Sequence, residues 1–214
     1  NLYVSDNQDF TGNAGKSRVL RVNMKDGKAT GVDCVVKGMG VANGLAVKGD
    51  CVYVCDTAIE KGPPLKSGVY KFKLSELDPA NPIVVKGLDD PRLIVKLETK
   101  NEKNAVGANG LCFDSKGNMY VANFGDREIT KVCFGGDGCV SGCEVIAKCV
   151  GESCDGMHTD QNDDLWVADF LGNAIIKVGT ESGNVTIVAK NGPGDGADGS
   201  LDAPSECIRR GDKV

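Results

Sequence analysis

Residues 153–178, SCDGMHTDQNDDLWVADFLGNAIIKV, carry the clearest secondary-structure pattern in the chain. They contain three short apolar runs, and turn residues at 161–164 and 171–173 separate these runs. Short apolar runs bounded by Asn, Asp and Gly are typical of β-strands joined in an antiparallel meander. The stretch therefore predicts a sheet of short strands.

The same pattern recurs along the chain. VGANGLCFDSKGNMYVANFGDREITKV at 106–132 and VANGLAVKGDCVYVCDT at 41–57 repeat it, and one aromatic position of the repeat is filled by Tyr3, Tyr53, Tyr120 and Trp166. The steps between these aromatics are 50, 67 and 46 residues, and four-stranded propeller blades repeat at roughly 40–50 residues. The second strand of each repeat is apolar on both faces, which suits a blade between two neighbours. We therefore predict an all-β fold, a β-propeller, with residues 1–214 as one domain of four repeat periods.

The longest step contains an insertion between residues 58 and 104. Its apolar runs at 83–85 and 93–95 are predicted to be an outer strand and an added one.

Composition excludes some partners. The chain carries 25 basic and 30 acidic residues, a net charge of −5 without clustering, so no nucleic-acid partner is expected. No run approaches the roughly 20 apolar residues of a membrane-spanning helix.

The cysteines raise a second question. The chain contains ten, and five lie within 22 residues: Cys133, Cys139, Cys143, Cys149 and Cys154. Such a density favours disulfides in a secreted or lumenal protein, with Cys149–Cys154 the best single pair. Zinc binding at Cys51-x3-Cys55 or Cys139-x3-Cys143 and free thiols are the alternatives. Asn184-Val185-Thr186 is a glycosylation sequon, which also favours secretion.

Two sets of polar residues repeat with the strands. The second strands end at Asp6, Asp56, Asn123 and Asp169, where such side chains commonly bond the backbone of the following turn. The first strands open with Asn43, Asn109, Asp155 and Ser205. On the repeat alone, this first-strand set is equally consistent with turn formation and with a shared oxygen-ligand site suited to Ca²⁺.

The series Asn43-Gly44-Leu45, Asn109-Gly110-Leu111 and Asp155-Gly156-Met157, together with residues 165–168 (LWVA), resembles the gluconolactonase / senescence-marker-protein / luciferin-regenerating-enzyme family. The resemblance implies a six-bladed propeller with one axial divalent cation, usually Ca²⁺, that hydrolyses lactones or phosphotriesters. It also implies that Asn109 and Asp155 are metal ligands, that Asn43 is a ligand or substrate contact, and that Ser205 lines the pocket. Asp155, the charged member, would then be central to catalysis on a small-molecule substrate, and another divalent cation could replace calcium.

One family feature is missing. The family supplies a glutamate from its first blade in a motif resembling GEGP, and no such motif occurs here. We therefore expect the four periods to be an excerpt of a six-bladed ring, incomplete at both ends, rather than a closed four-bladed one.

A second loop pattern is consistent with a non-catalytic function. Residues 191–204 (NGPGDGADGSLDAP) resemble the inter-blade loop of NHL-repeat propellers, whose rings are often non-catalytic. The alternative is a non-catalytic extracellular propeller that binds or assembles with a protein partner.

Overall fold

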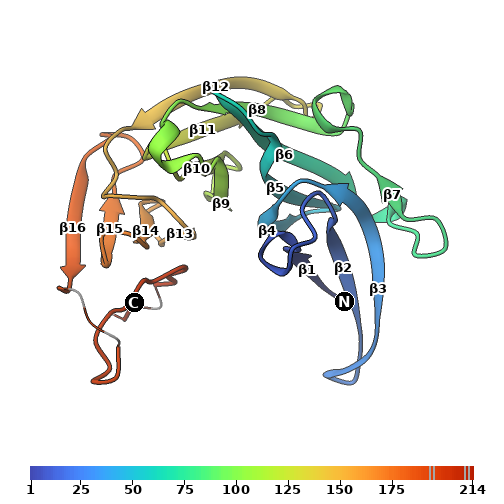
Figure 1. Ribbon diagram of the computed structural model, residues 1–214, viewed down its shortest axis with the longest axis horizontal. Helices are drawn as coiled ribbons and strands as arrows, with labels where there is room; N and C mark the ends of the chain where they lie inside the picture. Colours follow the sequence, from blue (N-terminus) through green and yellow to red (C-terminus); the bar gives the residue numbers. More distant parts are fainter. Residues whose placement is uncertain (193, 195, 210, 212) are drawn as a thin grey trace. The chain divides into compact units, whose positions relative to one another are not determined.

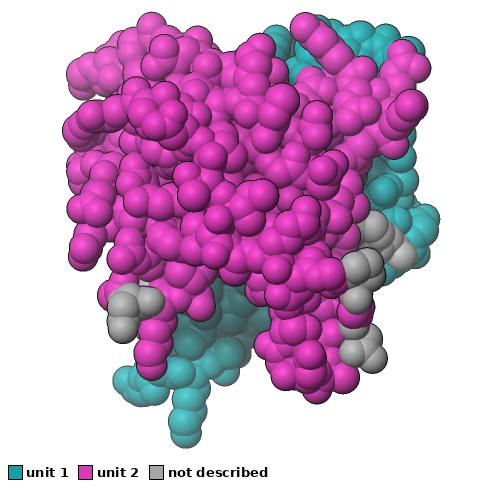
Figure 2. Space-filling view, turned by 90° about the vertical axis from the view of Figure 1, so that its left-hand side faces the viewer, with its two compact units in different colours: residues 1–98 teal, residues 99–214 magenta. Residues whose placement is uncertain are grey.

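The computed structural model describes residues 1–192, 194, 196–209, 211 and 213–214. The predicted propeller-type fold is confirmed: the described strands form four sheets of four strands each (Figure 1). They divide into two compact units, Asn1–Glu98 and Thr99–Val214 (Figure 2). Part of the loop at 191–204 lies outside the described residues, since Pro193 and Asp195 are among those not described.

The first unit holds two sheets. One sheet is built from β1 (Leu2–Asp6), β2 (Ser17–Lys25), β3 (Lys28–Met39) and β7 (Ile83–Val84). The other is built from β4 (Ala42–Lys48), β5 (Cys51–Glu60), β6 (Leu65–Lys73) and β8 (Leu93–Thr99). Short 3-10 helices lie at Asp9–Thr11, Leu74–Glu76 and Gly87–Asp89.

The insertion supplies both of the strands predicted for it. β8 is the outer strand of its own sheet, whereas β7 pairs in parallel with β3 of the other sheet through Val36↔Ile83 and Lys37↔Val84. The insertion therefore ties the two sheets of this unit together. Their shared core includes Met39, Val52 and the stacked rings of Tyr70 and Phe72, whose centroids lie 5.9 Å apart.

The second unit also holds two sheets. The first contains β9 (Ala108–Phe113), β10 (Met119–Asn123), β11 (Glu128–Phe134) and β12 (Val140–Ala147), preceded by a 3-10 helix at Glu102–Asn104. The second contains β13 (Met157–Thr159), β14 (Leu165–Asp169), β15 (Ala174–Val178) and β16 (Val185–Lys190). Every residue of β10 and β14 is buried, as expected for second strands apolar on both faces. Trp166 is 7% exposed and packs in a buried cluster with Ala168, Ile175 and Cys207.

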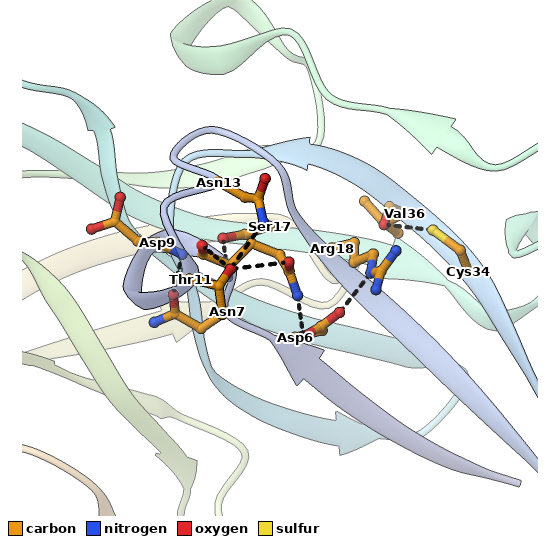
Figure 3. Close-up of polar contacts among 10 residues, drawn as sticks. Asp6, Asn7, Asp9, Thr11, Asn13, Ser17, Arg18, Cys34 and Val36 are labelled. Atoms are coloured by element: carbon orange, nitrogen blue, oxygen red, sulfur yellow. Dashed lines mark hydrogen bonds and ion pairs between the residues drawn. The ribbon is translucent and has the colours of Figure 1, made fainter.

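Asp6 and Asp56, predicted to end their second strands and to bond the turn that follows, have structural roles, although Asp56 lies within β5 rather than at its end. The Asp56 carboxylate accepts hydrogen bonds from the backbone N–H groups of Gly40 at 2.9 Å and Val41 at 2.8 Å. The Asp6 carboxylate accepts from the Arg18 guanidinium at 2.5 Å and the Gln8 amide at 2.7 Å (Figure 3). Asp56 therefore holds the residues that lead into β4, and Asp6 holds the turn after β1 and the start of β2.

The disulfide prediction is wrong. All ten cysteines are free thiols. In the favoured pair, Cys154 is buried and its thiol donates to the Asn123 carbonyl oxygen at 3.1 Å, whereas Cys149 is exposed at a left-handed φ of 55°. One side chain of this pair is therefore buried and hydrogen-bonded while the other lies at the surface, and the two do not form a disulfide.

The hairpin cysteines fail to pair for a geometric reason. Cys133 lies opposite Gly142 on the neighbouring strand, so Cys143 points to the other face of the sheet. Cys139 is exposed in the turn that precedes β12. Free thiols, one of the alternatives, are what the structure contains.

The predicted sequon lies on the surface. Asn184 is exposed in the turn that leads into β16. Secretion and glycosylation stay predictions. Within the described parts of the chain, no helix is long and apolar enough to span a membrane.

Candidate functional site

Two of the predicted site residues meet in the second unit. Asn109 is the second residue of β9 and is only 5% exposed, and Asp155 lies just before β13 and is half-buried. The Asn109 side-chain amide donates a hydrogen bond to the Asp155 carboxylate. The first strands of two neighbouring sheets therefore bring an amide and a carboxylate together.

The glycines that follow these residues allow this close approach. A Cβ atom on Gly110 would lie 2.4 Å from the Asp155 carbonyl oxygen, and one on Gly156 would lie 2.5 Å from the Ser205 carbonyl oxygen. The Gly156 N–H donates to that Ser205 oxygen at 3.0 Å. The Asn-Gly and Asp-Gly pairs of the repeat thus combine a polar side chain with a backbone that a neighbouring strand can touch.

A second carboxylate, that of Glu206, completes the cluster and was not predicted from the sequence. The Glu206 carboxylate packs against Gly156, where a Cβ atom would lie 2.6 Å from it. Ser205, the predicted pocket residue, is exposed and contacts Gly156 through its backbone carbonyl oxygen. The available signal was that Glu206 occupies the repeat position that is glycine in Asn109-Gly110 and Asp155-Gly156.

The negative charge of Glu206 acts on the neighbouring carboxyl group of Asp155. Burial and the nearby charge of Glu206 raise the pKa of Asp155 to about 6, although the hydrogen bonds from Asn109 and the Gly156 backbone act in the opposite direction. Partial burial of its carboxyl group raises the pKa of Glu206, although the residue as a whole is exposed, while the bond from the Cys207 N–H and the nearby His158 act to lower it. A raised carboxyl pKa indicates a site that disfavours a second negative charge.

The segment that carries Glu206 is held in place by its neighbours. The Arg209 guanidinium forms an ion pair with Asp160 at 2.9 Å and lies 5.2 Å from the centre of the Trp166 ring. The Trp166 indole N–H donates to the same Asp160 oxygen atom at 3.0 Å. Cys207 is buried against Trp166 as well. These contacts hold the residues that follow Glu206, and the bond from the Gly156 N–H to the Ser205 carbonyl oxygen holds the residue before it.

The donor set matches calcium chemically. Asn109, Asp155 and Glu206 offer two carboxylates and one amide, which are oxygen ligands of the kind that Ca²⁺ prefers, and a cation would relieve the repulsion between the carboxylates. Ca²⁺ takes six to eight oxygen atoms, so further oxygens from protein or water would be required. Among the described residues, no three His, Cys, Asp or Glu side chains are grouped to hold a metal.

Asn43 lies in the first unit. It is half-buried on β4, at an irregularity in the pairing with β5 between Ala42 and Leu45. Its role as a ligand stays a prediction.

Comparison with known proteins supports the family resemblance. Residues 95–191 match the family described as "SMP-30/Gluconolactonase/LRE-like region". The predicted resemblance is thus confirmed over the segment that contains Asn109 and Asp155. No curated protein sequence matches the chain.

Solved structures agree on the fold. A gluconolactonase from Xanthomonas campestris aligns with a TM-score of 0.56 and 19% identity, covering 89% of this chain and 58% of its own. A luciferin-regenerating enzyme aligns with a TM-score of 0.52 and 17% identity, covering 83% of this chain and 56% of its own. A PQQ-bound aldose sugar dehydrogenase from Streptomyces coelicolor reaches 0.50 with 16% identity, covering 83% and 60%. The chain therefore spans less than two thirds of each of these structures, and the likeness concerns the fold alone.

Proposed function

We propose that the protein is a calcium-dependent hydrolase that opens a lactone or a related ester at the cluster of Asn109, Asp155 and Glu206. One observation carries the proposal: the Asn109 amide bonds the Asp155 carboxylate, and the charge of the nearby Glu206 carboxylate helps to raise the pKa of Asp155 to about 6. Two of these residues lie in the segment that matches the lactonase-type family.

Asp155 is suited to act as a general base. A carboxyl group with a pKa of about 6 is ionised at neutral pH and is a stronger base than an ordinary aspartate. It would take a proton from the attacking water as the water oxygen bonds to the carbonyl carbon. The ring C–O bond then breaks, and the ring oxygen takes the proton.

The neighbouring residues set the state of this base. In the calcium-free protein, Asn109 holds the Asp155 carboxylate through its amide, and burial together with the charge of Glu206 keeps the pKa of Asp155 high. The same three side chains would be ligands for calcium. When bound, calcium would polarise the carbonyl oxygen of the substrate and lower the pKa of a bound water.

The test combines calorimetric titration with Ca²⁺ and a lactone-hydrolysis assay on the wild type, Asp155→Asn and Glu206→Gln. Both variants keep side-chain shape and remove one charge, so each is expected to weaken calcium binding about tenfold or more, since affinity follows ligand charge. Asp155→Asn is also expected to abolish hydrolysis.

Asp164→Asn is the matched control. It removes a charge that pairs with Lys177 at 2.7 Å, next to the opposite end of β14, and both readouts should stay at wild-type values. A wild type that neither binds calcium nor hydrolyses any lactone would contradict the proposal and favour the non-catalytic binding module.

A further inference from the structure

An apolar rim lies in the second unit, at the same end of the sheets as Asn109 and Asp155. It consists of Phe124, Phe170 and Leu171, which follow β10 and β14. The rings of Phe124 and Phe170 form a tilted pair with their centroids 6.5 Å apart, an arrangement typical of interacting aromatic side chains. Phe170 is 39% exposed and Leu171 is 55% exposed, whereas Phe124 is 7% exposed.

Strand pairing places this rim at the same end of the sheets as Asn109 and Asp155. The Phe124 N–H donates to the Gly107 carbonyl oxygen at 3.1 Å, two residues before Asn109. The Asp155 N–H donates to the Ala168 carbonyl oxygen at 2.9 Å, two residues before Phe170. Each phenylalanine thus follows the strand that pairs beside one of the two polar residues.

The turn after β14 is held by polar contacts rather than by its apolar side chains. The Asp169 carboxylate accepts a hydrogen bond from the Gly172 N–H at 2.9 Å, and the Leu171 N–H donates to the Ser153 hydroxyl at 3.0 Å. Exposing a large apolar side chain costs free energy that a polar residue would not. The turn itself therefore does not require Phe170 and Leu171 to be apolar.

The four sheets differ at this position. The residue that directly follows the last polar residue of the second strand is Asn7, Thr57, Phe124 or Phe170 in the four repeats. Phenylalanine occurs in the two sheets that contribute Asn109 and Asp155, and polar residues occur in the two sheets of the first unit. The apolar residues at this position therefore occur only in the two sheets that also contribute Asn109 and Asp155.

We infer that the site takes lactones or esters whose acyl part carries an alkyl or aryl group, and that this group lies on the rim of Phe124, Phe170 and Leu171. The inference rests on the proposed hydrolase function and specifies its substrate class. A polyhydroxylated sugar lactone would place hydroxyl groups against these side chains and lose hydrogen bonds to water. An alkyl chain would instead remove its own surface and that of Phe170 and Leu171 from water.

The experiment measures kcat/KM for a series of lactones that differ only in the length of an unbranched alkyl substituent. Full burial of one methylene group corresponds to about a fourfold gain, so a partly exposed rim should give about twofold per methylene. The double variant Phe170→Ser, Leu171→Ser is expected to flatten this dependence. The readout is the ratio of kcat/KM for the longest and shortest substrates, which cancels a general loss of activity.

Ile187→Ser is the matched control. Ile187 is 56% exposed on β16, in the same sheet but away from this turn, so the chain-length ratio should equal that of the wild type. A wild-type ratio independent of chain length, or a ratio unchanged in the double variant, would overturn the inference.

Calorimetric binding of the matching alkyl lactams, which resist hydrolysis, separates this inference from the proposed function. If lactam affinity rises with chain length but the protein hydrolyses no lactone, the rim binds alkyl groups and the proposed hydrolase function is wrong. If the protein hydrolyses lactones at rates that do not depend on chain length, the hydrolase function stands and the alkyl-binding role of the rim is wrong. Neither hydrolysis nor lactam binding would overturn both.

Discussion

Asp155 and Asp169 belong to the same repeat, yet their surroundings differ. Asp169, at the end of β14, is 2% exposed, and its carboxylate accepts hydrogen bonds from the backbone N–H groups of Glu152 at 2.9 Å, Ser153 at 2.8 Å and Gly172 at 2.9 Å. Asp155, just before β13, is half-buried beside a second carboxylate. The fold surrounds the Asp169 carboxylate with backbone donors, whereas Asp155 has fewer donors and a neighbouring negative charge.

These surroundings indicate which of the two repeated polar positions is available for chemistry. A buried carboxylate surrounded by backbone donors stabilises the turn that supplies them. A carboxylate whose ionisation is opposed by burial and by Glu206 has a raised pKa and can bind a proton or a cation. Position in the repeat alone does not distinguish these roles, because the distinction depends on what surrounds each side chain.

Removing the Asp169 carboxylate is expected to lower the free energy of unfolding more than any other change considered. Asp169→Ala leaves three backbone N–H groups and the Ser153 hydroxyl without their acceptor, and unsatisfied buried donors cost about 1–3 kcal/mol each. We expect the free energy of unfolding to fall by about 3 kcal/mol or more, measured by urea denaturation. A loss below about 1 kcal/mol would show that this turn does not depend on Asp169.

The close contact between first strands should give the next effect. Gly110→Ala would place a methyl group 2.4 Å from the Asp155 carbonyl oxygen, so the strands must separate. We expect a loss of about 2 kcal/mol in the free energy of unfolding, as for other overpacked sites, and weaker calcium binding.

Gly142→Ala on β12 is the control for this change. A Cβ atom there meets nothing within 4 Å, so stability should stay within about 1 kcal/mol of the wild type. Equal effects of the two substitutions would contradict the role given to Gly110.

The smallest effect is a pH dependence of stability in calcium-free protein. Since folding raises the pKa of Asp155 from 3.8 to about 6, the folded state binds the proton more tightly than the unfolded state. The stability contributed by this proton is complete below about pH 4 and is lost as the pH rises to about 6.

The measurement compares wild type with Asp155→Asn by urea denaturation from pH 4 to pH 7. The variant lacks this loss, so it should become the more stable protein above pH 6, by about 1 kcal/mol once solvent screening of a partly exposed group is allowed for. A difference between the two proteins that does not change with pH would rule out a raised Asp155 pKa.

Much of the fold could be predicted because the repeat is regular. Spacing of aromatic and apolar residues gave the four sheets, and the insertion between residues 58 and 104 was expected to carry two strands. The parallel pairing of β7 with β3 was not predictable, because it depends on where the insertion reaches in space rather than on its own sequence.

The candidate site was predicted in part for the same reason. Asn109 and Asp155 share one register of the repeat, and the structure brings them into contact. Glu206 was missed because it departs from that register, replacing the glycine found in the two preceding repeats. Cysteine spacing was misleading because the direction of a side chain, as for Cys154 towards the Asn123 carbonyl, is set by the sheet and not by distance along the chain.

We propose that Asp155 is an available ligand and base rather than a turn former. The most direct test is calorimetric titration of the wild type and Asp155→Asn with Ca²⁺ at pH 7.5, where Asp155 is ionised. We expect the wild type to bind and the variant, which keeps the shape and loses the charge, to bind at least about tenfold more weakly. Equal binding by the two proteins would contradict the claim and assign Asp155 the same structural role as Asp169.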